Sequence, residues 1–462
     1  MSDHSWLAGD NESMNRAEAI ATNGLIRETA PREDNKLRPE DRAAHDWYRF
    51  VLSFPPHLVR HYLQRFGIDS SKRVLDPFCG TGTTLVECKK LGIPSVGIES
   101  NPMACIASQV KVDWQVDPDR LLRHTASIAK RVVADLESQG IQDAWDDLPL
   151  CSRDQEALTK LRTLPAEAWK LLLKDSISPL PLHKALVLLE AVDGEKDQRF
   201  SQHERLALAK ALVFGISNLH FGPEVGVRPP KTDAPVIGTW LKGIRAMSDD
   251  LGELRGRSQT DAVVHHADSR YLSTILEPNS VDAVVTSPPY PNEKDYTRTT
   301  RLESVILGFI RSRQDLRALK QGLMRSNTRG VYKADHDDLL VANHGEIQRI
   351  ANAIENRRIE LGKTSGFERL YGRVTKLYFG GMARHLADLR MILRPGARLA
   401  YVVGDQASYL QVMIRTAQLL AEIAASFGYE TVSTDLFRTR LATATREQLR
   451  EEVLVLRWPG KR

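Results

Sequence analysis

Short apolar runs separated by stretches with helical spacing dominate the pattern of hydrophobic and polar positions near the start of the chain. The run Arg73–Leu75 leads into a glycine-rich loop, and Ser95–Glu99 follows after a helix-like stretch. Continuous apolar runs of this length are typical of strands buried on both faces of a parallel sheet. The alternation predicts an α/β fold with a doubly wound, mostly parallel, Rossmann-like sheet.

The same alternation resumes after residue 262. Helical spacing is present over 378–393 and 414–427, and further strands are predicted at 263–264, 281–285, 399–403, 431–436 and 453–456. Residues between these two parts have helical spacing and are too numerous for a single crossover. We therefore expect a sheet domain formed by 45–107 and 263–462, an inserted helical lobe at 108–262, a basic insertion at 296–370 and a flexible N-terminal arm at 1–44.

Composition is that of an ordinary globular protein. Of the 462 residues, 42% are hydrophobic and 27% are charged, and no run approaches the roughly 18 apolar residues of a membrane span. The polar N-terminus lacks the pattern of a signal peptide. We therefore expect a cytoplasmic protein of the bacterial cytosol or nucleoid.

Cysteine spacing and net charge change this picture little. Cys79, Cys88, Cys105 and Cys151 form neither a CxxC pair nor a set with histidines at zinc-ligand spacing, so we expect no disulfide framework and no metal. The net charge of +5 is compatible with a polyanionic partner but does not require one.

The loop after the first predicted strand, residues 76–84, reads DPFCGTGTT. Ligands of open α/β sheets bind where such a loop leaves the carboxyl end of a strand. Gly80 and Gly82 let a ligand approach the backbone and permit a positive φ, and Glu99, after the second strand, can accept hydrogen bonds from both hydroxyls of a ribose. The loop lacks the lysine of a phosphate-binding loop, and Leu85 replaces the third glycine of a dinucleotide fold. A nucleoside ligand is therefore favoured over a purely structural turn.

This loop and the acid after it resemble the S-adenosylmethionine site of amino-methylating DNA methyltransferases. The resemblance implies that S-adenosyl-L-methionine is the cofactor, that Phe54 and Pro55 pack on its methionine end, and that Asp268 lies near its adenine amino group. Asp268 as a capping residue and Phe54 as a core aromatic are the structural alternatives. The expected cofactor-binding residues are Phe54, Pro55, Asp76, Pro77, Phe78, Gly80, Gly82, Thr83, Thr84, Glu99, Ser100, Asp268, Ser269 and Thr286.

A second motif, Thr286–Tyr290, reads TSPPY and follows the predicted strand 281–285. It should face the same crevice as the glycine loop, because parallel strands end at one edge of the sheet. If the Ser287 hydroxyl and the Pro288 carbonyl accept the two hydrogens of an exocyclic amino group, the nitrogen can pyramidalise and direct its lone pair at a methyl donor. Pro289 stiffens the turn, and the Tyr290 ring can stack on a flipped base. Alone, the motif also fits a proline-rich turn.

Together the two motifs resemble the N4-cytosine and N6-adenine DNA methyltransferases of the SPPY type, in a permuted arrangement with the cofactor motif first. The resemblance covers approximately 46–107 and 263–460 and implies that Ser287, Pro288, Pro289 and Tyr290 are catalytic. Serine in the first position is typical of N4-cytosine enzymes, whereas aspartate is usual in N6-adenine enzymes. The resemblance favours cytosine, with adenine as the alternative.

Double-stranded DNA is the partner that this resemblance implies, with a cognate restriction endonuclease or defence system as a further candidate. We expect Arg298, Arg301, Arg325 and Arg329 in the basic insertion to contact phosphates. The loop 223–231 of the lobe is a second candidate. An RNA base methyltransferase and a non-catalytic, cofactor-binding, DNA-associated protein are the alternatives, although the RNA enzymes typically carry asparagine in place of Ser287 and the intact TSPPY motif favours catalysis.

Overall fold

The computed structural model describes residues 37–49, 54–143, 161–222, 224–292, 294–441 and 448–460. Most of the predicted N-terminal arm, together with Cys151 and Pro223, lies outside these residues. The described end of the arm forms η1 (Pro39–Asp41) and α1 (Arg42–His45). It is packed rather than free, because Ala44 is fully buried and its N–H donates to Asp250 Oδ2 at 2.9 Å.

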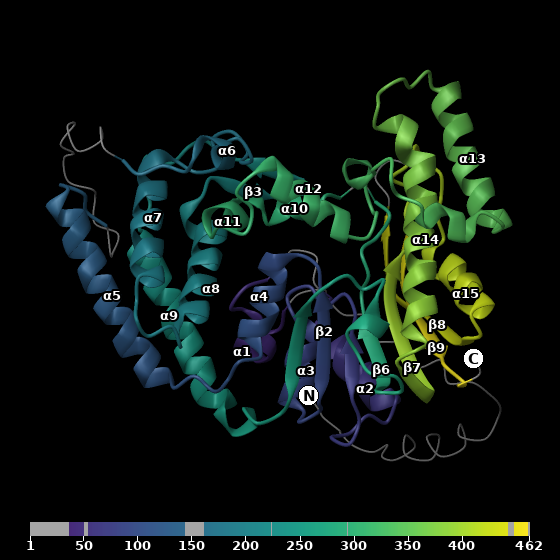
Figure 1. Ribbon diagram of the computed structural model, residues 1–462, viewed down its shortest axis with the longest axis horizontal. Helices are drawn as coiled ribbons and strands as arrows, with labels where there is room; N and C mark the ends of the chain where they lie inside the picture. Colours follow the sequence, from purple (N-terminus) through teal and green to yellow (C-terminus); the bar gives the residue numbers. More distant parts are fainter. Residues whose placement is uncertain are drawn as a thin grey trace, which may run out of the picture.

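A seven-stranded sheet forms the centre of the molecule (Figure 1). Five of its strands are parallel, and the two C-terminal strands complete one side in antiparallel pairing. From one edge to the other, the strands are β5 (Ala262–His266), β2 (Ser95–Glu99), β1 (Val74–Asp76), β6 (Val281–Thr286), β7 (Leu393–Gly404), β9 (Gln448–Arg457) and β8 (Glu430–Leu441). The predicted α/β, mostly parallel fold is confirmed.

The strand order reverses between β1 and β6. From β1 the chain builds outward to β2 and β5, and then returns to the centre to form β6 on the other side of β1. Val74 pairs with Ala283 and Leu75 with Val284, so the two strands end side by side. Because the flanking crossovers diverge at such a reversal, a crevice forms at the carboxyl ends of these strands. Both sequence motifs begin there.

Helices cover both faces of the sheet. Consecutive side chains of a strand point to opposite faces, so Val74 packs in the cluster that contains α2 (Pro56–Arg65), whereas Leu75 packs in the cluster that contains α14 (Tyr371–Leu389) and α15 (Thr416–Ser426). Helix α3 (Thr83–Lys90) follows β1 directly, and α4 (Pro102–Lys111) follows β2. These helices hold the loops of the crevice in place.

The segment between β2 and β5 forms a largely helical lobe beside the sheet, with a short hairpin (Figure 1). Helix α5 (Pro118–Ser138) is capped by Asp117, whose side chain accepts from the Arg120 N–H, and it buries Leu121, Ile128 and Leu136 along one stripe. Apolar residues at this spacing face one side of a helix. The lobe contains α5 (Pro118–Ser138), α6 (Ala166–Trp169), α7 (Pro179–Asp193), α8 (Ser201–Ala211), η3 (Leu212–Ile216), β3 (Leu219–Phe221), β4 (Val225–Val227), α9 (Val236–Leu254) and η4 (Arg255–Arg257).

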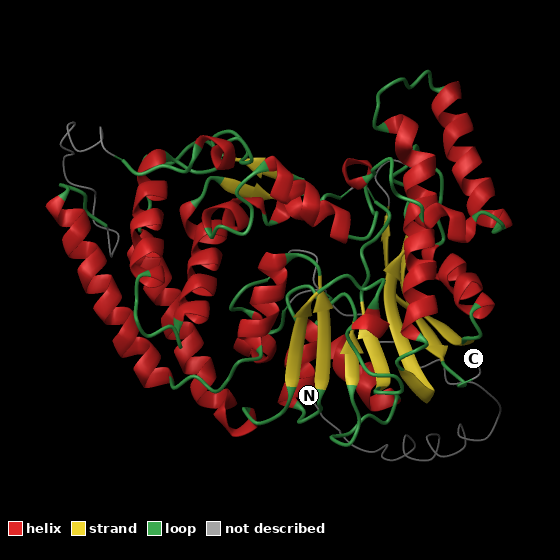
Figure 2. Cartoon of the chain, in the orientation of Figure 1, coloured by secondary structure: helices red, strands yellow, loops and turns green. Residues whose placement is uncertain are grey.

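The segment predicted as a basic insertion, 296–370, is divided between two cores. Leu302 and Ile306 pack with the helical lobe, whereas Ile347 and Ile354 pack with α14 on the sheet. The arrows of β2 and β5 point toward the first of these parts in Figure 2. The segment contains α10 (Tyr296–Thr299), α11 (Arg301–Ile306), α12 (Arg313–Gly322), η6 (Thr328–Gly330), η7 (Asp337–Val341), α13 (Gly345–Glu360) and η8 (Glu368–Leu370).

Some element boundaries differ from the predicted ones. Helix α14 begins at Tyr371 and ends at Leu389, and β7 already begins at Leu393 rather than at 399. The early start is explained by pairing of Leu393 with Val281, followed by a register shift before Arg398 pairs with Ala283. The short helix η5 (Leu272–Thr274) lies between β5 and β6. None of the described helices has the length and apolarity needed to cross a membrane.

Candidate active site

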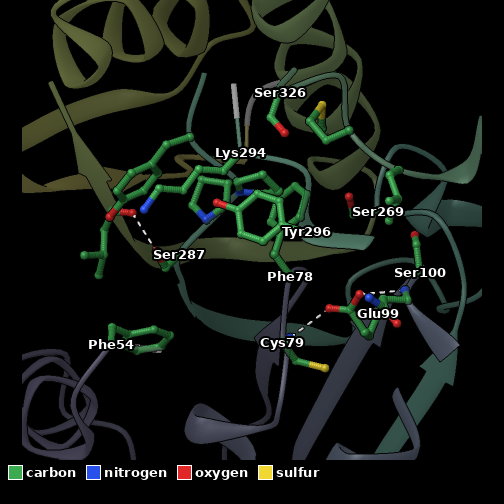
Figure 3. Close-up of a pocket in the computed structure, with 18 of the residues that line it drawn as sticks. Phe54, Phe78, Cys79, Glu99, Ser100, Ser269, Ser287, Lys294, Tyr296 and Ser326 are labelled. Atoms are coloured by element: carbon green, nitrogen blue, oxygen red, sulfur yellow. Dashed lines mark hydrogen bonds between the residues drawn. The ribbon is translucent and has the colours of Figure 1, made fainter. Parts of the chain in front are cut away.

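A cavity of about 250 Å³ opens at the carboxyl ends of β1, β2 and β6. In the view of Figure 3, Phe78 is drawn between Ser287 and Glu99, so residues of both motifs border one space. The cavity is lined by twelve of the predicted site residues, namely Phe54, Pro77, Phe78, Gly80, Thr83, Glu99, Ser100, Ser269, Ser287, Pro288, Pro289 and Tyr290. The two motifs are therefore brought together, as expected from the order of the strands.

Asp76 and Thr84 do not line the cavity but join the two central strands beneath it. The Asp76 carboxylate is fully buried, and its Oδ1 accepts from Thr286 Oγ1 at 2.6 Å and from the Phe78 N–H at 3.1 Å. Thr84 Oγ1 donates to the Val285 carbonyl at 3.1 Å. Burial raises the pKa of Asp76 to about 6, although hydrogen bonds from Thr286 and the Phe78 N–H oppose the rise. The loop that follows β1 is thus tied to the end of β6.

Glu99 lies at the end of β2 and presents a carboxylate to the cavity. Its Oε2 accepts from the Gly80 N–H at 2.9 Å, and its Oε1 accepts from the Asn101 N–H at 2.7 Å (Figure 3). A carboxylate offers about four acceptor positions, so each oxygen can accept a further hydroxyl. Burial raises the pKa of Glu99 to about 7, against the effect of these backbone donors.

The two glycines of the loop have different roles. Gly80 has a φ of +53°, and a methyl group in place of its hydrogen would meet nothing within 4 Å, so its cavity side is open. Gly82 has a φ of +84°, but a methyl group there would lie 2.4 Å from Ser108 Oγ on α4. The need for glycine at position 82 is therefore explained by the close approach of Ser108, and a cofactor contact of Gly82 stays a prediction.

Ser287 is oriented by a neighbouring strand. Its hydroxyl donates to the Val402 carbonyl of β7 at 3.2 Å. Because this bond uses the hydrogen, the lone pairs of Ser287 Oγ are left to accept. Tyr290 lies against the same strand, since a methyl group at Gly404 would be only 3.1 Å from its ring. Burial raises the pKa of the Tyr290 phenol well above its ordinary value.

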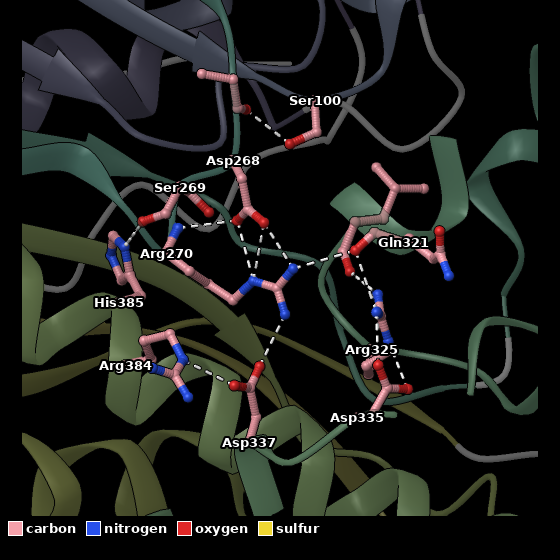
Figure 4. Close-up of polar contacts among 12 residues, drawn as sticks. Ser100, Asp268, Ser269, Arg270, Gln321, Arg325, Asp335, Asp337, Arg384 and His385 are labelled. Carbon is pink, nitrogen blue, oxygen red and sulfur yellow. Dashed lines mark hydrogen bonds and ion pairs between the residues drawn. The ribbon is translucent and has the colours of Figure 1, made fainter. Parts of the chain in front are cut away.

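Pro55, Asp268 and Thr286 also lie outside the cavity lining. Pro55 directly precedes α2. The Asp268 carboxylate is held by the Arg270 guanidinium, with Nη2 at 2.6 Å from Oδ2, and Arg270 also reaches Asp337 Oδ2 at 2.8 Å (Figure 4). The position of Asp268 therefore does not support an adenine contact, whereas its neighbour Ser269 lines the cavity.

Of the four arginines expected to contact DNA, Arg325 is the one whose side chain is buried. It is 5% exposed and pairs with the Asp335 carboxylate, with Nη2 at 2.8 Å from Oδ1 (Figure 4). A buried, paired guanidinium is poorly placed to contact a phosphate, so the structure gives no support to this prediction for Arg325. Arg298 and Arg301 are half-buried and donate to the Val225 carbonyl and to Thr297, respectively, whereas Arg329 is exposed and lies over the Phe367 ring.

Several lining residues were not predicted from the sequence. Arg438 and Glu451 come from β8 and β9, and Asn327 and Met324 from the insertion. No local motif marks them, since they reach the cavity only through pairing of the C-terminal strands and through the return of the insertion. Tyr296, at the start of α10, also lines the cavity.

Comparisons with known proteins find sequence similarity to DNA methyltransferases. Residues 23–109 match a family model described as DNA methylase. The Type II methyltransferase M.BsoBI of Geobacillus stearothermophilus is 24% identical over 434 residues, which cover 88% of this chain and 83% of that protein. The Type II methyltransferase M.AvaI of Anabaena variabilis is 24% identical over 471 residues, covering 94% of this chain and 90% of that protein. The solved structure of TrmN from Thermus thermophilus aligns with 87% of this chain and 48% of that one, at 12% identity and a TM-score of 0.25.

The methyl donor of such enzymes is S-adenosylmethionine, and the residues at the crevice fit it. Glu99 can hold a ribose, and Gly80 leaves the space for it. Asp76 Oδ2 is buried and has no hydrogen-bond partner among the described residues, as expected beneath a cationic ligand. The family match at the cofactor loop and the similarity to two Type II methyltransferases along most of their length support an amino-methyltransferase family for this chain.

Proposed function

We propose that the protein is a site-specific DNA methyltransferase that methylates the exocyclic N4 of cytosine in a flipped-out base. The observation that carries the proposal is the position of Ser287, whose hydroxyl borders the same cavity as Glu99 and Gly80 while its hydrogen is directed to Val402. An acceptor for an amino group and a candidate nucleoside site thus share one space. The relatives M.BsoBI and M.AvaI are Type II methyltransferases, and the matched family model is that of a DNA methylase.

The residues around Ser287 supply positioning and electrostatics. An exocyclic amino group is a poor nucleophile because its lone pair is conjugated with the ring. Acceptance of its two hydrogens by Ser287 Oγ and the Pro288 carbonyl would release that lone pair, and the Tyr290 ring would stack on the base. When bound, S-adenosylmethionine supplies the electrophilic methyl group. Such alignment of reacting groups accounts for a large part of the rate enhancement in group transfer.

The identity of the base rests on Ser287. A hydroxyl in this position is typical of the N4-cytosine members of the family, whereas a carboxylate is usual in the N6-adenine members. The hydrogen bond to Val402 supports an acceptor role for the hydroxyl, because the donor hydrogen is already engaged. N6-adenine methylation is the alternative outcome of the test below.

Analysis of the methylated nucleoside tests this proposal. Purified protein is incubated with methyl-labelled S-adenosylmethionine and either duplex DNA or total RNA, and the product is digested to nucleosides. Label in N4-methyldeoxycytidine is expected. Label in N6-methyldeoxyadenosine alone would overturn the cytosine assignment, and label only in RNA would overturn the DNA assignment. Cofactor binding without transfer to any substrate would favour a non-catalytic role.

Substitution of Ser287 tests the mechanism within the same assay. Ser287→Ala is expected to lower the single-turnover rate by about 100-fold or more, as does removal of one preorganised polar contact in other enzymes, while the cofactor Kd stays within about twofold. Ser138→Ala is a matched control, because Ser138 is an exposed serine at the end of α5. Equal rates for the two variants would contradict the proposed role of the hydroxyl.

A further inference from the structure

Arg438 and Glu451 form a charged pair in the lining of the cavity. They lie directly opposite each other on β8 and β9, and both line the cavity together with Tyr290. Arg438 Nε donates to Glu451 Oε2. Neither the glycine loop nor the TSPPY motif explains why an ion pair borders the space that those motifs share.

The pair lies next to the ring of Tyr290. Gly404 of β7 is the register partner of Glu451. A methyl group at Gly404 would lie 3.5 Å from Glu451 Cγ and 3.1 Å from the Tyr290 ring, so both side chains approach the same point of the backbone. The negative charge of Glu451 contributes to the raised pKa of Tyr290, after burial, which agrees with this proximity.

The guanidinium of Arg438 has N–H groups that are available to donate to a ligand. Its Nε is held by Glu451, whereas its two terminal nitrogens have no hydrogen-bond partner among the residues that the structure describes. The Glu451 side chain is 12% exposed and that of Arg438 is 36% exposed. A carboxylate that holds one edge of a guanidinium fixes the plane in which the remaining N–H groups donate.

Cytosine offers acceptors that such a donor set can use. Next to the exocyclic N4, the ring carries N3 and then the O2 carbonyl, which are two adjacent acceptors. Adenine carries N1 next to its amino group, but the following position is a C–H. A guanidinium that reaches past the amino group toward the ring edge therefore distinguishes the two bases by the number of hydrogen bonds it can make.

We propose that Arg438, oriented by Glu451, binds the N3 and O2 edge of the target cytosine while the TSPPY motif holds its amino group. The inference rests on the proposed function, since it assigns a specificity-determining contact to that same cavity. Arg438 contacts the base, and Glu451 is a positioning residue that acts through Arg438.

The test combines enzyme variants with a modified substrate. Once the methylated position has been mapped, the kinetic parameters kcat and KM are measured on duplexes that carry cytosine or 2-thiocytosine there, because sulfur is a weaker hydrogen-bond acceptor than oxygen. Arg438→Met is compared with Arg457→Met. Arg457 is a matched control because it also pairs across the same two strands, with Glu430, but does not line the cavity.

For the wild type and Arg457→Met, 2-thiocytosine is expected to lower kcat/KM by about tenfold, which is the scale of one hydrogen bond to a charged group. Arg438→Met is expected to lose at least about tenfold on ordinary cytosine and to show no further loss on 2-thiocytosine. For Glu451→Gln, the loss of kcat/KM on ordinary cytosine is expected to be smaller than that of Arg438→Met. The cofactor Kd and the melting temperature of Arg438→Met should match those of Arg457→Met, which excludes misfolding as the cause.

Two failures can be told apart. If the wild type forms N4-methylcytosine but Arg438→Met behaves as Arg457→Met on both duplexes, the contact proposed here is wrong and the proposed function stands. If the wild type methylates only adenine, the cytosine assignment fails and the contact with it. A loss on 2-thiocytosine that is equally large in Arg438→Met would place the O2 contact elsewhere in the cavity and overturn the assignment of Arg438.

Discussion

Thr286 Oγ1 lies 2.6 Å from Asp76 Oδ1, and both side chains are fully buried. The last residue of the strand that carries the TSPPY motif is thereby joined to the last residue of the strand that carries the cofactor loop. The carboxylate gains a donor that offsets part of its burial cost. This contact couples the geometry of the two motifs.

Replacement of Thr286 by valine is expected to destabilise the protein more at pH 8 than at pH 5. Burial holds the pKa of Asp76 at about 6, above its ordinary value, so the stability that this group contributes is present at low pH and is lost as the pH rises through about 6. The Thr286 hydroxyl, which valine lacks, stabilises the carboxylate form of Asp76, and this form is populated when the pH is above the pKa of about 6. A loss of about 1.5–3 kcal/mol at pH 8 is expected from unfolding curves. Thr286→Ser, which keeps the donor, should be close to wild type, and a loss that does not vary with pH would contradict the role of this bond.

Cofactor affinity is expected to rise with pH between 6 and 8. Burial raises the pKa of Glu99 to about 7, and only its carboxylate form can accept both hydroxyls of a ribose. The Kd measured by calorimetry should fall by about tenfold over this range, as a single protonation with this pKa requires. The Glu99→Gln variant should bind the cofactor about 10-fold to 100-fold more weakly at pH 8, and its Kd should not vary with pH. A Kd of the wild type that does not depend on pH would argue against the ribose contact.

Alanine at the two loop glycines is expected to have different effects. Gly82→Ala would place a methyl group 2.4 Å from Ser108 Oγ, so a loss of about 1–3 kcal/mol in stability is expected from overpacking, in addition to the strain of its positive φ. The methyl group of Gly80→Ala would contact no neighbour. The free energy of unfolding should therefore fall only by the backbone strain of about 1 kcal/mol, whereas cofactor binding should weaken. Melting temperatures and cofactor Kd values separate the two roles. Ser108→Ala should restore part of the stability of Gly82→Ala, and a lack of any recovery would mean that Ser108 is not the obstacle.

Alanine at two arginines of the insertion should separate folding from DNA binding. Arg325→Ala removes the guanidinium from the half-buried Asp335 carboxylate, which keeps only the Tyr332 N–H as a donor among the described residues, so a loss of about 1–3 kcal/mol in stability is expected. Arg329 is exposed, so Arg329→Ala should keep the melting temperature. If Arg329 contacts a phosphate, the variant should lower DNA affinity and reduce the slope of log K against log salt by about one. Unchanged affinity and slope would remove Arg329 from the DNA-binding surface.

Local patterns were sufficient for much of the fold. Buried strands can be recognised in a sequence by their continuous apolar runs. The strand predicted at 95–99 on this basis coincides with β2. The predicted start of β7 was late, because Leu393 joins the sheet through pairing with Val281 and not through its own apolar pattern. Pairing across the sheet is a tertiary property that no local window contains.

The sequence by itself determined that two motifs end two strands of one α/β sheet, because the residue types of a strand and its turn are set locally by periodicity and by glycine and proline. The tertiary structure alone decided which atoms these motifs present. The Asp268 carboxylate accepts hydrogen bonds from Arg270, and Arg325 forms an ion pair with Asp335. Ser108 packs against Gly82. None of these partners belongs to either motif. Likewise, Arg438 and Glu451 reach the cavity only because β8 and β9 pair beside β7. Side-chain engagement depends on three-dimensional neighbours, whereas strand and turn preferences depend mainly on the chain itself.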